Sequence, residues 1–172
     1  MDMETIMKMM LQSGALEQVS GMLGVDDKSA ESAIEYVMPM LLQGMQSQMK
    51  SEDTKYGFIQ ALNDHSKTDT KDLRKAVKNA DVDDGAKIVK HLLGAKEEEV
   101  AAKATRKSGL DTKTILKIMA ILAPILMSKM GQTAKTQTSQ SGGSGDMLKV
   151  VGGLLDGVDA KDVINILGML MK

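Results

Sequence analysis

The stretch Gly109–Met130 constrains the fold of this chain more than any other part of the sequence. Ten consecutive residues within it, Ile118–Met127, carry no polar side chain, and Pro124 lies among them. A surface helix keeps one polar face, whereas a helix that is apolar on every face has to be buried. We therefore predict a central core helix that begins near Asp111 and bends at Pro124, where the proline removes one backbone hydrogen bond.

This stretch has a relative 85 residues upstream, because Gly24–Met45 aligns with Gly109–Met130 without a gap. The shared residues are Gly24 and Gly109, Asp26 and Asp111, Lys28 and Lys113, Pro39 and Pro124, Leu41 and Leu126, and Met45 and Met130. Glycine ends the preceding helix and aspartate caps the next one. The sequence thus predicts a helix–turn–kinked-helix unit used twice, near residues 15–49 and 95–130, with a shortened third copy from Gly157.

Helical periodicity runs along most of the chain, and strand-like alternation is almost absent. We therefore predict an all-α multihelical domain over residues 1–130, with no β-sheet. Within it, Asp81–Gly85 is expected to be a loop that precedes a helix over residues 86–93. Residues 131–146 are rich in Gly, Ser, Thr and Gln, which predicts a flexible linker. Residues 147–172 are expected to form a C-terminal helical segment that packs on this domain or on another chain.

The composition excludes several classes of function. The chain has no cysteine, which rules out disulfides, thiol catalysis and cysteine metal sites. Its net charge is only −1, and arginine, the preferred phosphate-binding residue, occurs only at positions 74 and 106. The acidic N-terminus does not resemble a signal peptide, and no continuous apolar run approaches the ~20 residues of a membrane span. We expect a cytoplasmic protein without a membrane span.

Residues 100–118 resemble a helix-turn-helix, with Gly109 at the turn. A recognition helix needs an exposed polar face that enters the major groove of DNA. Here the second helix becomes apolar on all sides within two turns of its start. Its exposed beginning offers only Thr112, Lys113, Thr114 and Lys117. DNA binding is therefore an alternative function, and a nucleic-acid partner is not the leading expectation.

The two histidines, His65 and His91, are the strongest candidates for chemistry. With Asp64, Asp83 and Asp84 they could form a metal site, or an acid–base pair in a pocket, if the fold brought them together. No two of them, however, have the spacing of a metal-binding motif. Each histidine lies near the end of an expected helix, where it can serve the helix dipole. We predict no catalytic residue, no metal ligand and no cofactor, and keep an enzyme or metal-binding protein as the second alternative.

The chain is rich in methionine, with 16 residues against three aromatic ones. Flexible thioether side chains can form adaptable binding surfaces, although filling the core is their more common role. The leading hypothesis is a non-enzymatic protein-interaction or scaffold protein, with a protein partner or self-association and no small-molecule ligand. It predicts a solvent-open apolar groove or a stable dimer.

Several segments together resemble a known bacterial family. They are Asp84–Gly94, Glu99–Ala102, Ser108–Met127, Gly24–Asp26, Pro39–Leu42, Leu62–His65, Leu154–Gly157 and Leu167–Leu170. This ordered set resembles the bacterial domain of unknown function 937. The resemblance implies a bacterial, all-helical protein, with a relation to the YidB-like helical proteins as a further implication. It implies no activity, cofactor or catalytic residue.

Overall fold

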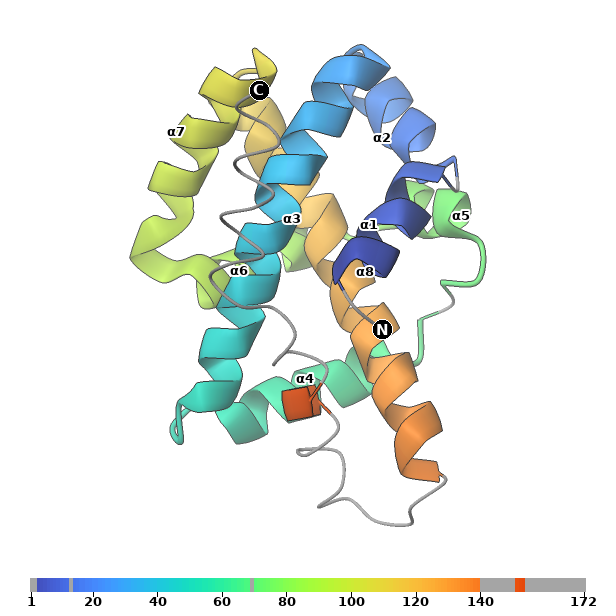
Figure 1. Cartoon of the computed structure of the whole chain (residues 1–172), viewed down its shortest axis with the longest axis vertical. Coiled ribbons are helices and arrows are strands. Elements are labelled where there is room, and N and C mark those ends of the chain that lie inside the picture. Colours follow the sequence, from blue (N-terminus) through green and yellow to red (C-terminus); the bar gives the residue numbers. More distant parts are fainter. Residues whose placement is uncertain (1–2, 13, 69, 140–150, 154–172) are drawn as a thin grey trace.

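The computed structural model describes residues 3–12, 14–68, 70–139 and 151–153, with side chains from residue 8 to residue 135 and in the last segment. In these residues the predicted all-α class is confirmed, since they contain helices and no strand (Figure 1). The elements are α1 (Met3–Gln12), α2 (Ala15–Leu23), α3 (Asp27–Lys50), α4 (Lys55–His65), α5 (Leu73–Lys78), α6 (Val82–Leu93), η1 (Gly94–Lys96), α7 (Glu97–Ser108) and α8 (Thr112–Ser139).

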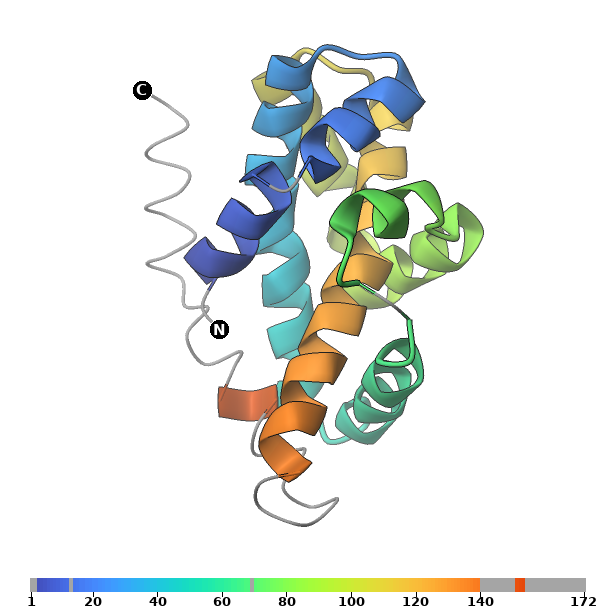
Figure 2. The ribbon, with the colours of Figure 1, turned by 90° about the vertical axis from the view of Figure 1, so that its right-hand side faces the viewer.

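The two long proline-containing helices, α3 and α8, form the centre of the molecule. Helices α6 and α4 pack along α8, α7 packs along α3, and α2 packs against α5 (Figure 2). The predicted core helix is confirmed, because α8 supplies many of the largest fully buried side chains. They are Ile115, Ile118, Met119, Ile121, Leu122 and Leu126.

Both copies of the repeated unit begin in the same way. Gly24 and Gly109 have φ values of 67° and 76°, in the left-handed region that glycine adopts most easily. Asp26 and Asp111 each accept a hydrogen bond from the backbone N–H three residues further on, at 3.0 Å and 2.7 Å. The glycine stop and the aspartate cap therefore act as the sequence predicts.

These two caps predict a dependence of stability on pH. The side-chain hydroxyl and backbone N–H of Ser29 hold the pKa of Asp26 below its ordinary value of 3.8. Hydrogen bonds from Thr114 likewise lower the pKa of Asp111. Because the folded-state pKa is depressed, this stabilisation is complete above about pH 4 and is lost as the pH falls through the folded-state values.

We therefore expect the double variant Asp26→Asn/Asp111→Asn to match the wild type in urea unfolding near neutral pH. Asparagine also caps helices well but does not titrate. Below about pH 3 the variant should become the more stable of the two proteins. The same stability difference at neutral and acidic pH would contradict this assignment.

The structure corrects two expectations about element boundaries. The expected linker over residues 131–146 is wrong for its first nine residues, because α8 continues to Ser139. Gly131 lies directly against the carbonyl group of Leu62, and Ala134 is fully buried, so packing overrides the weak helix propensity. Val151 is also fully buried in the core. The other residues of the expected C-terminal segment, 147–150 and 154–172, lie outside the described residues.

The expected loop at Asp81–Gly85 is also wrong, because α6 already begins at Val82. Asp81 is the N-cap of this helix and accepts a hydrogen bond from the backbone N–H of Asp84 at 3.1 Å. Gly85 is buried in the first turn, where α6 meets α8. This glycine thus permits close helix packing and does not form a turn.

By length and composition alone, one described helix could cross a membrane, namely the Thr112–Lys135 part of α8. Of its most apolar 18-residue window, 72% is buried inside the protein. Core helices of soluble proteins have the same composition, and the contacts of α8 with α3, α4, α6 and α7 account for its apolar surface.

Candidate functional site

A cleft of about 550 Å³ opens between α4, α5, α6 and α8. This volume is within the usual range for ligand-binding clefts. Its apolar floor is formed by Ala76, Ala80, Pro124 and Ile125. We call it the His65 cleft, and it lies beside Pro124 of α8.

The rim of the His65 cleft carries four carboxylates, from Asp64, Asp72, Asp81 and Asp84. Lys75 is the one lysine or arginine among the residues that line it. Asp72 and Asp81 also cap α5 and α6, so helix termini fix their positions. An excess of carboxylates over cations gives the cleft a negative potential.

His65 lies at the end of α4 and contacts two oxygen atoms. Its Nδ1 is 2.8 Å from the carbonyl oxygen of Ala61, and its Nε2 is 3.1 Å from Oδ2 of Asp84. The doubly protonated ring can donate to both oxygens, whereas either neutral tautomer can donate to only one. In this arrangement neither ring nitrogen is free to contact a ligand in the cleft.

The His65–Asp84 pair connects two helix ends of opposite polarity. His65 is in the last turn of α4, and Asp84 is in the first turn of α6. The position of Asp84 suits its negative charge, since helix dipoles favour anions at N-termini. The side chains are 21% and 49% exposed, so the pair contributes at most about 1 kcal/mol. It positions the cleft wall more than it stabilises the protein.

Gln132 fixes the loop that follows α4. Its side-chain amide donates to the carbonyl oxygens of Ser66 and Thr68, and its Oε1 accepts from the Thr70 hydroxyl at 2.7 Å. Thr70 is only 1% exposed. The extension of α8 beyond Gly131 therefore holds one wall of the His65 cleft in place.

We predict that Gln132→Ala lowers the free energy of unfolding by about 1–3 kcal/mol, because the buried Thr70 hydroxyl loses its acceptor. Adding Thr70→Val removes the unpaired hydroxyl and should restore part of this loss. Urea unfolding of the two variants and the wild type measures both effects. A double variant that is less stable than Gln132→Ala would contradict the proposed role of the pair.

The structure brings together only some of the histidines and aspartates that the sequence suggests as a metal or acid–base site. His65, Asp64 and Asp84 line the His65 cleft, whereas His91 is exposed and lines a different cleft. Within the described ranges, no three His, Cys, Asp or Glu side chains are grouped so as to hold a metal ion. Sequence patterns do not predict that the cleft also includes Thr70, Lys75, Pro124 and Ser128. These residues are distant from one another in the sequence and form no motif.

The helix-turn-helix-like segment presents only a small polar surface. Thr112, Lys113 and Lys117 are exposed at the start of α8, and Thr114 is half-buried. Every residue of Ile118–Ala123 is buried. A helix that is buried after its second turn has little length available for a DNA groove.

The apolar surface of the described residues is limited. Among their large hydrophobic side chains, only Met22 and Tyr56 are well exposed, at 42% and 62%. Six methionines belong to the core, which fits their role as filling residues: Met10, Met38, Met45, Met119, Met127 and Met130. The described residues therefore present no broad apolar face to solvent.

The fold and the cleft together define a multihelical protein with a carboxylate-rimmed cleft beside Pro124 of its core helix. A family model described as "Bacterial protein of unknown function (DUF937)" matches residues 5–133. The chain therefore belongs to this family, and the match includes the whole His65 cleft. No curated protein and no solved structure matches the chain.

Proposed function

We propose that this protein is a non-enzymatic, cytoplasmic protein-interaction protein that binds a positively charged group of its partner in the His65 cleft. One observation carries the proposal: the cleft combines an apolar floor at Pro124 and Ile125 with a carboxylate rim. Lysine and arginine have the matching chemistry, because an aliphatic stem carries their charged head. The partner group is therefore a lysine or arginine side chain.

The hydrogen bonds within the cleft favour binding over catalysis. A general base needs a free ring nitrogen within reach of its substrate, and both nitrogens of His65 face protein oxygens. The hydroxyl of Ser128 donates to the carbonyl oxygen of Pro124 at 2.8 Å, so it is also engaged. These groups support a fixed binding surface better than an acid–base pair.

Butylammonium, which has the stem and charge of a lysine side chain, is a suitable probe. The protein is labelled at its isoleucine methyl groups, and the spectrum of Ile125→Val assigns the Ile125 signal. We expect butylammonium to shift the Ile125 signal in a saturable manner, while the signal of Ile34, fully buried in α3, does not move. Butyrate, with the opposite charge, should produce no such shift. An equal response to both probes, or no response at Ile125, would overturn the proposal.

A further inference from the structure

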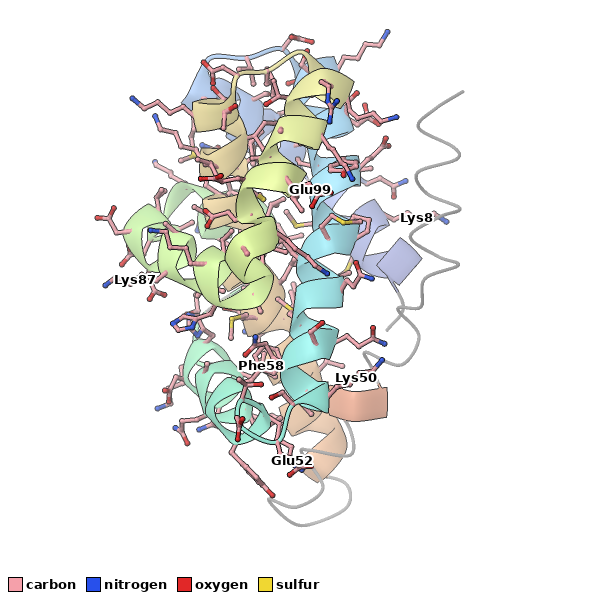
Figure 3. All side chains as sticks on the ribbon, turned by 90° about the vertical axis from the view of Figure 1, so that its left-hand side faces the viewer. Lys8, Lys50, Glu52, Phe58, Lys87 and Glu99 are labelled. Carbon is pink, nitrogen blue, oxygen red and sulfur yellow. The ribbon has the colours of Figure 1, made fainter. Side chains whose placement is uncertain are left out.

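A second cleft lies on the same side of α4. It has a volume of about 350 Å³ and is lined mainly by the apolar side chains of Phe58, Ala61, Ile88, Leu92 and Met127. Phe58 points from α4 toward the interior, as Figure 3 shows, and is only 6% exposed. We call this second site the Phe58 cleft. Its remaining lining residues are Gln48, Asp53, Thr54, Gly57 and His91, so it carries one carboxylate where the His65 cleft carries four.

Residues of both α4 and α6 line each of the two clefts. On α4, Gly57 and Ala61 line the Phe58 cleft, and Asp64 follows on the same helix face in the His65 cleft. On α6, Ile88 lines the Phe58 cleft and Asp84, one turn earlier, lines the His65 cleft. The residues of both clefts thus form one continuous stripe on each helix.

Helices α4 and α6 contact each other only weakly. Helix α4 packs mainly on α8 and α3, and only Phe58 and Leu62 of its eleven residues are buried. The His65–Asp84 hydrogen bond is the one side-chain link between α4 and α6 that the structure describes. A Cβ atom at Gly57 would meet nothing within 4 Å. The space between α4 and α6 is therefore open at the Phe58 cleft. At the His65 cleft, a single polar contact crosses it.

From these observations we infer that the two clefts form one groove for a single partner segment. The inference rests on the proposed function, since the basic side chain of that segment occupies the His65 cleft. An apolar side chain of the same segment occupies the Phe58 cleft. Gly57 and Asp64 are seven residues apart, which corresponds to about 10 Å along a helix. A partner helix along the groove would carry its apolar and basic residues seven positions apart.

Alkylammonium ions of different length test this inference. Butylammonium fills only the His65 cleft, whereas the chain of decylammonium is long enough to reach the Phe58 cleft. We expect both ions to shift the Ile125 methyl signal, and only decylammonium to shift that of Ile88. Because additional methylene groups become buried, decylammonium should bind roughly tenfold more tightly or better. Decanoate, which has a chain of the same length and the opposite charge, serves as the control.

The variant Gly57→Leu places a side chain in the open space of the Phe58 cleft. It should abolish the Ile88 shift and the affinity gain of decylammonium while butylammonium still binds. Gly21→Leu in α2, also at a position with open space, is the matched control and should behave as the wild type. If both ions shift Ile125 with equal affinity and Ile88 does not respond, the single groove is refuted and the proposed function stands. If neither ion shifts Ile125, the proposed function itself fails.

Discussion

Gly85→Ala is expected to destabilise the protein by about 3 kcal/mol or more, at the upper end of the range for overpacked cores. A Cβ atom at this position would lie 1.8 Å from the carbonyl oxygen of Ala120, which is far inside van der Waals contact. That oxygen is available because Pro124, four residues later, has no N–H to bond it. The α6 backbone at Gly85 therefore lies close to the α8 backbone at Ala120, in the manner of Cα–H···O contacts between helices.

Urea unfolding of Gly85→Ala measures this loss, and Gly57→Ala is its matched control. Gly57 is also in the first turn of a helix, but an added Cβ meets nothing within 4 Å. Alanine there should stabilise the protein by about 0.5–1 kcal/mol, since glycine loses more backbone entropy on folding. If Gly85→Ala were as stable as the wild type, the close contact between α6 and α8 would be wrong.

The second large effect concerns the repeated unit. Leu41 in α3 and Leu126 in α8 occupy equivalent positions of the two copies and are 0% and 2% exposed. Replacing either residue with alanine is expected to cost about 2–5 kcal/mol, because each substitution leaves a cavity in the shared core. Urea or thermal unfolding of the two single variants measures these costs.

Gln43→Ala in α3 is the control for this pair, because Gln43 is exposed. It should change the free energy of unfolding by no more than about 0.5 kcal/mol. A large loss for Leu126→Ala with almost none for Leu41→Ala would show that only one copy of the repeat contributes to the core.

The elements that could be predicted from the sequence are those whose signals are local. Neighbouring residues and helical periodicity determine three such features. They are the glycine stops at Gly24 and Gly109, the caps at Asp26 and Asp111, and the burial of α8. For this reason the all-α class, the two glycine stops and the two aspartate caps are confirmed.

The features that could not be predicted depend on contacts between distant residues. The local sequence predicts a loop at Gly85, because the packing partner of this glycine, Ala120, lies 35 residues further along the chain and leaves no local signal. The helical residues after Gly131 are held by contacts with the end of α4, which their composition does not reveal. The His65 cleft combines residues from four helices, and of these the sequence singles out only His65, Asp64 and Asp84, as part of the candidate metal or acid–base set.

The most direct test of the central claim compares the binding of butylammonium to Asp64→Asn and Asp83→Asn. Asp64 lines the His65 cleft, whereas Asp83 is an exposed residue of the same region that does not line it. Both variants remove one negative charge and keep the shape of the side chain. Asp64→Asn should weaken binding roughly threefold or more, as expected for one exposed charge pair, and Asp83→Asn should have a clearly smaller effect. Equal weakening by both variants would contradict the account, because the probe would then respond to overall charge and not to the cleft.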